Sequence, residues 1–253
     1  MNPFVHLSVL HGNTDNSEYS SEDKAGVSRL FLFNSNFPKR LVNTTKNNSE
    51  FCKLLKFFET EKAKNPKRIL HPDLEVYNSI TDEGSLKQAS VLIAVTRPTA
   101  QADSQIVLTV RSADLKSHAG QISLPGGKRE SADSDAVATA LRESEEEIGL
   151  PPSKVKVLGK LGDLALPSGY LVTPIVGLIN AGLHFIRQED EVEDIFKAPL
   201  SLILEIPSYK RSKVEFKGKE RTILEIQYGC YRIWGATAAI LFNLAQNVSQ
   251  KSI

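Results

Sequence analysis

The sequence predicts an α/β fold in which helices cover both faces of a sheet. Apolar, β-branched runs of strand length lie at residues 89–95 and 105–110, and a continuous apolar run at 171–179 is typical of a strand buried on both faces. Residues 136–148 form a strong helix pattern between these strands, and residues 236–248 form another after them. Strands that alternate with helices in this way imply a layered architecture.

The first 85 residues predict an N-terminal extension of helical and irregular structure. Residues 1–48 are polar, rich in Ser and Asn and without periodicity, so part of the extension is expected to be disordered. One short amphipathic helix is expected at residues 51–62, because its apolar residues recur at helical spacing: Phe51, Leu54, Leu55 and Phe58. A basic cluster follows: Lys62, Lys64, Lys67 and Arg68. A solvated linker is the favoured interpretation of this cluster over a contact with phosphate.

Residues 86–250 predict the main domain. After the first helix we expect a partly alternating strand at 155–164 and, beyond the buried strand, a helix at 191–203 limited or kinked by Pro199. A hairpin is expected at 222–234. The closing helix should turn four residues inward: Ala239, Ile240, Leu244 and Val248.

Composition narrows the classes of partner. The chain has 253 residues with a formal net charge of +1, which gives no reason to expect nucleic acid or an anionic membrane as partner. Its two cysteines are too few for a disulfide framework. No apolar run reaches the length of a membrane span, and no targeting segment is apparent, so we expect a cytoplasmic protein. The sequence leaves a homodimer open.

The strongest chemical signal is an acidic helical face. Glu143, Glu146 and Glu147 stand at positions i, i+3 and i+4, which places their side chains on one face of a helix. Like charges at these spacings repel one another, and a bound cation would relieve that repulsion. Oxygen ligands without nearby Cys or His favour Mg²⁺ or Mn²⁺ over zinc. The alternative is a solvated acidic face.

The residues around this helix favour a site. Gly126 and Gly127 provide a turn that a ligand can approach closely. Asp133 or Asp135 suits the N-cap of the helix, and Gly149 stands where a left-handed C-terminal residue belongs. The pattern is therefore loop, helix and glycine-terminated loop, with one acidic face.

This segment resembles the Nudix box, G-x5-E-x7-R-E-U-x-E-E-x-G-U, where U is aliphatic. Its second half matches without a gap, from Arg142 to Leu150, although Ser144 replaces an aliphatic residue. The first half matches only if one residue is inserted after Gly127, which brings Asp133 to the position of the box glutamate, with Asp135 as the other candidate. The resemblance implies an α/β/α sandwich with a mixed central sheet.

A second signature resembles the motif of the coenzyme A pyrophosphatase branch of Nudix hydrolases, roughly LLTxRSxxLxxHxGQxxFPGG. Residues 108–127 read LTVRSADLKSHAGQISLPGG, in which Leu124 replaces the usual Phe. The inserted residue in the box is itself typical of that branch. The resemblance covers residues 88–240 and is most specific over 108–150.

The resemblance implies roles for particular residues. Glu143, Glu146, Glu147 and the carbonyl of Gly127 are the expected ligands of Mg²⁺ or Mn²⁺. For the general base, Glu146 and a distal-loop residue, best placed at Glu191, both remain open. Arg142 is expected to hold box carboxylates in place, and a direct role in catalysis is the less favoured alternative. Substrate binding is expected of three residues from the second signature: Arg111, Ser112 and His118. A purely structural role for His118 is about equally supported.

The resemblance implies hydrolysis of the diphosphate of coenzyme A or its derivatives, to 3′,5′-ADP and 4′-phosphopantetheine. The same chemistry on another nucleoside diphosphate, such as ADP-ribose or NADH, is the alternative. A catalytically silent Nudix binding module is a third possibility. Loss of a box glutamate is the usual mark of such a module, and all three are present here.

Overall fold

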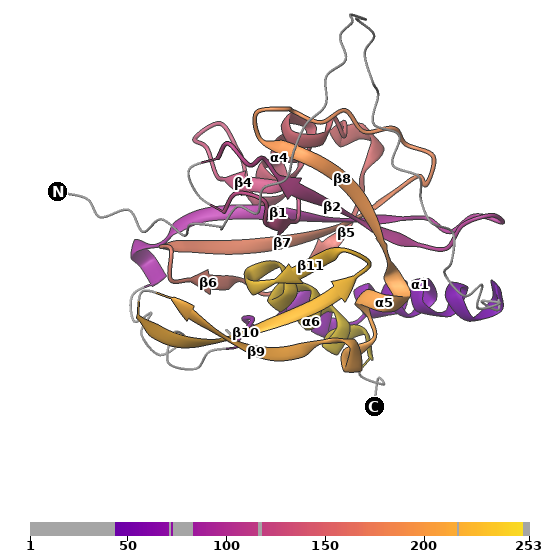
Figure 1. Ribbon diagram of the computed structural model, residues 1–253. Helices are drawn as coiled ribbons and strands as arrows, with labels where there is room; N and C mark the ends of the chain where they lie inside the picture. The colour runs from indigo at the N-terminus through magenta and orange to yellow at the C-terminus, as the bar shows by residue number, and fades with distance from the viewer. Residues whose placement is uncertain (1–43, 71, 73–82, 116–117, 217, 250–253) are drawn as a thin grey trace, which may run out of the picture. The chain divides into compact units, whose positions relative to one another are not determined.

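The computed structural model describes residues 44–70, 72, 83–115, 118–216 and 218–249 (Figure 1). Its helices are α1 (Thr44–Phe58), α2 (Glu61–Lys64), α4 (Ala136–Ile148), α5 (Leu200–Ile203) and α6 (Gly235–Ser249). The strands are β1 (Lys87–Thr96), β2 (Gln105–Arg111), β3 (Ile122–Ser123), β4 (Gly126–Lys128), β5 (Lys156–Lys160), β6 (Leu164–Leu166), β7 (Tyr170–Ile179), β8 (Val192–Pro199), β9 (Lys210–Phe216), β10 (Lys219–Tyr228) and β11 (Tyr231–Trp234). Three single turns of 3₁₀ helix lie at Glu83–Ser85, Pro152–Lys154 and Ile206–Ser208.

The main sheet is mixed, as predicted. Strand β1 runs parallel to β7 along its whole length, from the Lys87–Tyr170 pair to the Thr96–Ile179 pair. The other pairings are antiparallel: β1 with β2 and β4, β2 with β3 and β8, and β7 with β5 and β6. A separate three-stranded antiparallel sheet has the order β11-β10-β9.

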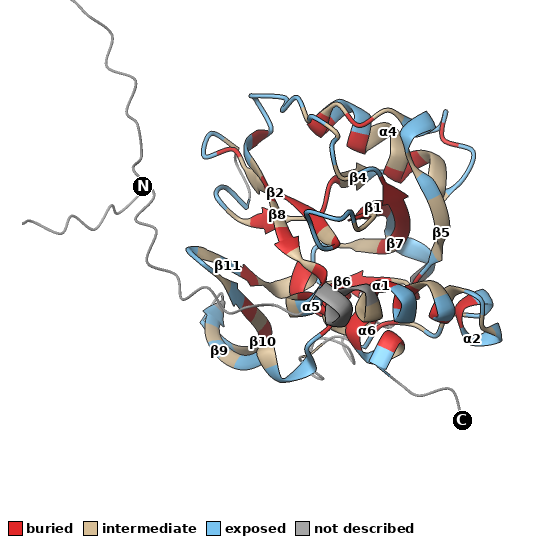
Figure 2. Cartoon of the chain, turned by 90° about the vertical axis from the view of Figure 1, so that its right-hand side faces the viewer, coloured by how far each residue is buried: buried red, intermediate tan, exposed pale blue. Residues whose placement is uncertain are grey.

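Helices cover both faces of the main sheet, which confirms the predicted sandwich (Figure 1). On one face α4 packs through Ala140 and Ile148 against Leu92, Val107 and Ile175. On the other face α1, α5 and α6 form a larger core with the opposite side chains of the same strands. Figure 2 shows the inner strands as buried. Because successive side chains of a strand point to opposite faces, an unbroken apolar run suits such a doubly covered strand.

Helix α6 confirms the predicted closing helix. The four residues expected to face inward, Ala239, Ile240, Leu244 and Val248, are all buried in the larger core. Within the part of the chain that the structure describes, no helix is both long and apolar enough to cross a membrane.

The expected helix at 51–62 is present with different bounds. Helix α1 ends at Phe58 and the short α2 begins at Glu61. Thr60 separates them, because its hydroxyl donates to the carbonyl of Phe57 at 2.7 Å and accepts from the amide of Ala63. Phe51 and Leu54 of α1 are buried in the core of the main sheet. The predicted division into an extension at 1–85 and a domain at 86–250 stays a prediction, and residues 1–43 lie outside the described ranges.

The helix predicted at 191–203 is wrong. The chain there forms strand β8 along β2, and only Leu200–Ile203 turns into a helix. Val192, Ile195 and Phe196 have helical spacing, but Ile195 packs on the core beneath α4 while Phe196 packs on the opposite core. Adjacent side chains on opposite faces define a strand. The β2 main chain supplies hydrogen-bond partners that the sequence pattern does not reveal.

Two further predictions are only partly correct. The single strand expected at 155–164 is divided into β5 and β6, and β5 carries a register shift between Val157 and Gly159. The hairpin expected at 222–234 is confirmed as β10 and β11, but β9 adds a third strand that the prediction missed.

Candidate active site

The acidic helix α4 has the bounds that the sequence predicts, from Ala136 to Ile148. At its start, the carboxylate of Asp135 accepts a hydrogen bond of 2.8 Å from the amide of Ala138, which is an N-cap. At its end, Gly149 adopts φ 63° and its amide donates to the carbonyl of Glu145. A left-handed residue at this position favours glycine.

Ser144 is a polar residue at a position that is aliphatic in the box, and a hydrogen bond within α4 explains how the helix tolerates it. Its side chain is fully buried, and its hydroxyl donates to the carbonyl of Ala140 at 2.7 Å. The hydroxyl is therefore satisfied within the helix, as buried polar groups require. Ala140 and Ile148 bury the same side of the helix, which leaves the carboxylate face toward the loops.

The three carboxylates of that face have different surroundings. Glu147 is 4% exposed, and one of its oxygens accepts a hydrogen bond from the amide of Gly126 at 3.2 Å. Burial raises the pKa of Glu147 to about 8, opposed by this hydrogen bond and by the charge of Arg111. Burial also raises the pKa of Glu143. Glu146 is exposed and pairs with Arg142 at 2.8 Å.

Strand β4 brings the two glycines against these carboxylates. A side chain at Gly127 would place its Cβ 2.5 Å from Oε2 of Glu143, so the absence of a side chain lets the carboxylate lie against the main chain. A Cβ at Gly126 would meet backbone of β1, 2.6 Å from the Cα of Val91. Gly126 has φ 151°, which L side chains rarely adopt. The two glycines are therefore required for different reasons.

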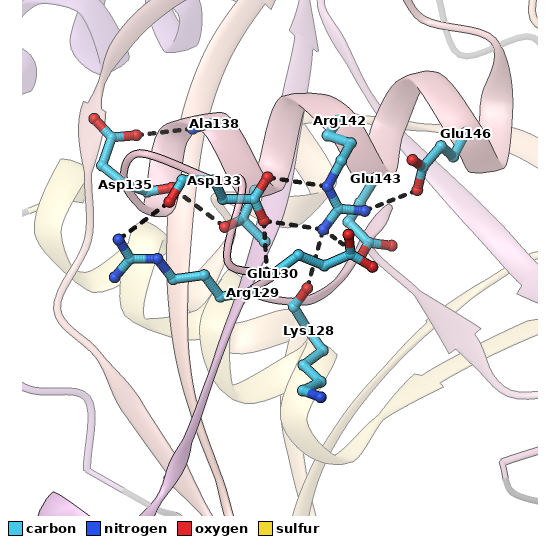
Figure 3. A network of polar contacts seen from close by, with 10 residues as sticks. Lys128, Arg129, Glu130, Asp133, Asp135, Ala138, Arg142, Glu143 and Glu146 are labelled. Carbon is cyan, nitrogen blue, oxygen red and sulfur yellow. Dashed lines mark hydrogen bonds and ion pairs between the residues drawn. The ribbon is translucent and has the colours of Figure 1, made fainter.

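Arg142 lies at the centre of a polar network (Figure 3). Its Nε donates to Oδ1 of Asp133 and its Nη2 to Oδ2, both at 3.0 Å. The same guanidinium pairs with Glu143 at 3.0 Å and with Glu146 at 2.8 Å. Hydrogen bonds from Arg142 and from the amide of Glu130 hold the pKa of Asp133 well below its usual range. Asp133 is therefore the aspartate of the arginine network, and Asp135 is the N-cap of α4.

Arg129 organises the inserted loop and was missed by the sequence analysis. Its guanidinium donates to the carbonyls of Asp133 and Ser134, at 3.2 and 2.8 Å, and to the side chain of Gln88 at 2.7 Å. It therefore ties the loop that carries Asp133 to strand β1. No spacing rule marks an arginine for this function, because its partners are two carbonyls and a distant amide.

The three residues predicted to bind substrate lie at and beyond the end of β2. Arg111 lies close enough to Glu147 for its charge to lower the pKa of that carboxyl. Its Nε is buried and has no hydrogen-bond partner among the described residues. Ser112 is buried, and its hydroxyl accepts from the amide of Asp114. His118 has φ 60°, and its Nδ1 lies 2.8 Å from Oε1 of Gln121. Of the three, Arg111 is the one whose charge acts on a box carboxylate.

The loop before β8 is fastened to the end of α4. The amide of Ile186 donates to the carbonyl of Ile148 at 3.0 Å, and that of Gln188 to the carbonyl of Glu147 at 2.9 Å. Further along, the carbonyl of Glu191 accepts from the amide of Ser112 at 2.8 Å. The charge of Glu191 contributes to the raised pKa of both Glu143 and Glu147, so its carboxylate lies near them.

The donors at this site fit a hard divalent cation. Among the described residues no three acidic, His or Cys side chains already converge on one point, and Glu146 is paired with Arg142. Glu147 is a buried carboxylate held by a single main-chain amide, and Glu143 lies against the glycine strand. Burial makes the ionised forms of these two groups costly, and a cation would offset that cost. Oxygen donors of this type suit Mg²⁺ and similar ions.

This chain is similar in sequence to Nudix proteins. The NUDIX domain model matches residues 86–200. A relative from Photorhabdus laumondii, named as an uncharacterized Nudix hydrolase NudL, is 47% identical over 143 residues, which cover 56% of this chain and 76% of the relative. A relative of the same name from Yersinia pestis is 40% identical over 179 residues, covering 70% of this chain and 88% of the relative. A MutT/nudix family protein from Enterococcus faecalis, of known structure, is similar with a TM-score of 0.41 and 12% identity over 76% of this chain and 72% of the other.

The fold and the carboxylate helix define a hydrolase of the class that generally uses divalent metal ions. The chain belongs to the Nudix hydrolase family.

Proposed function

We propose that this Nudix hydrolase cleaves the diphosphate of coenzyme A or of its derivatives. The observation that carries the proposal is that the charge of Arg111 acts on Glu147, where it opposes the rise in the pKa of that carboxyl. Arg111 belongs to the segment that resembles the coenzyme A motif, and Glu147 belongs to the box. The unpartnered, buried Nε of Arg111 supports a role in binding an anionic group, since guanidinium offers paired donors to phosphate oxygens.

Glu143, Glu146, Glu147 and the carbonyl of Gly127 would hold Mg²⁺ or Mn²⁺. When bound, the cation would offset negative charge on the diphosphate and favour ionisation of a water. Glu146 pairs with Arg142 through one carboxylate oxygen, so its other oxygen could join the ligands, and the guanidinium is also paired with Asp133 and Glu143. Arg142 therefore orients the carboxylates in this proposal and does not contact the substrate.

Proton transfer is assigned to the loop before β8. We assign to Glu191 the acceptance of a proton from the attacking water, because its carboxylate is exposed and lies near Glu143 and Glu147. Glu146 is the competing base. The water oxygen becomes bonded to one phosphorus, the bridging P–O bond breaks, and the products are 3′,5′-ADP and 4′-phosphopantetheine.

Substrate choice is assigned to the end of β2 and the loop that follows. Arg111 would bind a phosphate of the substrate, with Ser112 and His118 shaping the adjoining loop. A preference for coenzyme A requires recognition of its 3′-phosphate or its pantetheine arm, whereas ADP-ribose and NADH lack both.

The test is product analysis with purified full-length protein. Coenzyme A, 3′-dephospho-coenzyme A, ADP-ribose and NADH are each incubated with Mg²⁺ and with EDTA. Metal-dependent release of 3′,5′-ADP from coenzyme A is expected, at a rate well above the turnover of ADP-ribose and NADH. Preferential cleavage of ADP-ribose or NADH would retain the diphosphatase chemistry and reject coenzyme A as the substrate. An absence of metal-dependent cleavage of all four would reject the proposal.

A further inference from the structure

The side chain of Arg129 binds main-chain groups of the loop that leads into α4 (Figure 3). Its Nη2 donates to the carbonyls of Asp133 and Ser134, at 3.2 and 2.8 Å, and its Nη1 donates to Oε1 of Gln88 on β1 at 2.7 Å. The amide of Arg129 also donates to the carbonyl of Gln88, at 2.9 Å. Gln88 therefore holds Arg129 through main chain and side chain, and Arg129 holds the loop.

The loop at residues 130–135 is held by hydrogen bonds rather than by apolar packing. Asp133 alone of these six residues is buried, and the segment contains neither glycine nor proline. Two bonds lie within the loop: the amide of Asp133 donates to the carbonyl of Glu130 at 3.1 Å, and the amide of Glu130 donates to the carboxylate of Asp133 at 2.9 Å. These bonds close the loop on itself, whereas the bonds of Arg129 attach it to strand β1.

Asp133 lies between two arginines that bind its opposite ends (Figure 3). Arg129 binds its carbonyl, and Arg142 binds both of its carboxylate oxygens, each at 3.0 Å. Arg142 also pairs with Glu143 at 3.0 Å and with Glu146 at 2.8 Å. Hydrogen bonds weaken steeply when their angles depart from linearity, so the guanidinium cannot follow a displaced loop and keep its contacts with the helix. The arrangement of the acidic face therefore depends on where the loop is held.

We propose that Arg129 is a positioning residue of the carboxylate site. It acts through Asp133 and Arg142, and it determines how far Glu143 and Glu146 are arranged in advance for a cation. Residues that orient metal ligands from outside the coordination sphere commonly change the metal affinity when they are replaced. This inference rests on the proposed function in one respect, namely that these carboxylates hold a divalent ion.

The charge of Arg129 gives the test a direction. A guanidinium near a cation site repels the ion, so its removal would, by charge alone, strengthen metal binding or leave it unchanged. Loss of positioning has the opposite sign and weakens metal binding. A purely structural role would lower the free energy of unfolding without changing the metal affinity of the folded chain.

The first measurement is the dissociation constant of Mn²⁺ for the full-length chain, followed by electron paramagnetic resonance without substrate. Arg129→Ala should raise this constant about threefold to tenfold, less than a residue that contacts a metal ligand directly. Arg129→Lys keeps the charge but lacks the planar set of donors, so it should recover only part of the loss. Gln88→Ala removes one of the partners of Arg129 and should give a smaller rise.

Lys154→Ala is the matched control, because it removes an exposed cation beyond the end of α4 and should keep the wild-type constant. Urea unfolding shows that each variant is folded under the conditions of the titration. An unchanged constant in Arg129→Ala, or a lower one, would overturn the proposal.

The double variant Arg129→Ala/Asp133→Asn tests whether Asp133 carries the effect. Replacements that act through one network are not additive, so the rise caused by Arg129→Ala should be much smaller when Asp133 is already Asn. Independent effects that multiply in full would contradict a path through Asp133.

A measurement without metal separates this proposal from the metal assignment. In nuclear magnetic resonance spectra recorded with EDTA, the Nε–H of Arg142, which donates to Asp133, should exchange with solvent faster in Arg129→Ala than in the wild type or in Lys154→Ala. Unchanged exchange would overturn the proposal even in a chain that binds Mn²⁺. Faster exchange in a chain whose wild type binds no Mn²⁺ would reject the metal assignment and uphold the positioning of Arg142 by Arg129.

Discussion

Asp133 and Arg142 form a two-point ion pair, in which each carboxylate oxygen lies 3.0 Å from a different guanidinium nitrogen. The aspartate is nearly buried and also accepts from the amide of Glu130 at 2.9 Å. The pair fixes the guanidinium, and the guanidinium in turn contacts Glu143 and Glu146. The pair thereby links the loop before α4 to two carboxylates of the acidic face.

Replacement of Asp133 by Asn should weaken both stability and turnover. The variant removes the charge of the partner that makes two contacts with Arg142, which keeps its pairs with Glu143 and Glu146. We expect a loss of about 2–3 kcal/mol in the free energy of unfolding, below the figure for fully buried pairs because Arg142 is partly exposed. Asp135→Asn is the matched control, since Asn is an equally good N-cap. Urea unfolding measures both, and equal losses in the two variants would contradict a special role for Asp133.

The same pair predicts an acid-side dependence of stability. The pKa of Asp133 is lowered in the folded chain, so its contribution is fully present above the unfolded value of about 3.8 and is lost as the pH falls below that value. The difference in unfolding free energy between wild type and Asp133→Asn should therefore shrink from pH 6 to pH 3. Urea titrations across this range provide the measurement. A constant difference would indicate that the effect of the variant is not electrostatic.

Glu147→Gln should abolish turnover without loss of stability. Burial raises the pKa of Glu147 from 4.5 to about 8, so the fold favours the protonated carboxyl and the metal-free protein loses stability as the pH rises through that interval. A neutral glutamine avoids this cost. At pH 8.5 with EDTA, the variant should be at least as stable as the wild type in urea unfolding. Full activity in the variant would contradict the metal assignment.

Metal binding should release protons near neutral pH. Because Glu147 with a pKa of about 8 is mostly protonated at pH 7, a cation that needs its carboxylate must displace the proton. Calorimetric titration of the wild type with Mg²⁺, in two buffers of different ionisation enthalpy, measures the number of protons released per bound ion. This number should approach one at pH 7 and should be smaller at pH 9. Proton release that does not change between these pH values would argue against Glu147 as a ligand.

The two glycines of β4 should respond differently to alanine. Gly126→Ala places a side chain against the backbone of β1 at φ 151°, and a loss of about 3 kcal/mol in unfolding free energy is expected. At Gly127 the added Cβ meets only the flexible end of Glu143, so stability should change by about 1 kcal/mol or less while the Mg²⁺ concentration needed for activity rises. Similar metal dependence in Gly127→Ala and wild type would remove Gly127 and Glu143 from the proposed site.

Local signals were enough to predict α4 but not β8. The bounds of α4 follow from an N-cap aspartate and a left-handed glycine, both next to the helix in sequence. In β8, the spacing of Val192, Ile195 and Phe196 suits a helix and a strand alike, and the decision rests with the β2 backbone. Strand β9 was missed because no side chain of residues 210–215 is buried, so its pairing with β10 is what defines it.

The candidate site was predictable in its parts and less so in its assembly. The spacing of Glu143, Glu146 and Glu147 predicted one helical face, but not that Glu146 would be turned to Arg142. The proximity of Arg111 to Glu147 depends on pairing between strands that are distant in sequence.

The loop before β8 is attached to α4 through main-chain groups, from Ile186 to Ile148 and from Gln188 to Glu147. Such bonds do not depend on which side chains the loop carries. The side chain of Ile186 is 77% exposed, so it is not needed to hold the loop in the core. This segment can therefore change its side chains, and with them what it presents to a bound molecule, while helix α4 keeps the same neighbour. New specificities can arise here without a change in how the carboxylate helix is held.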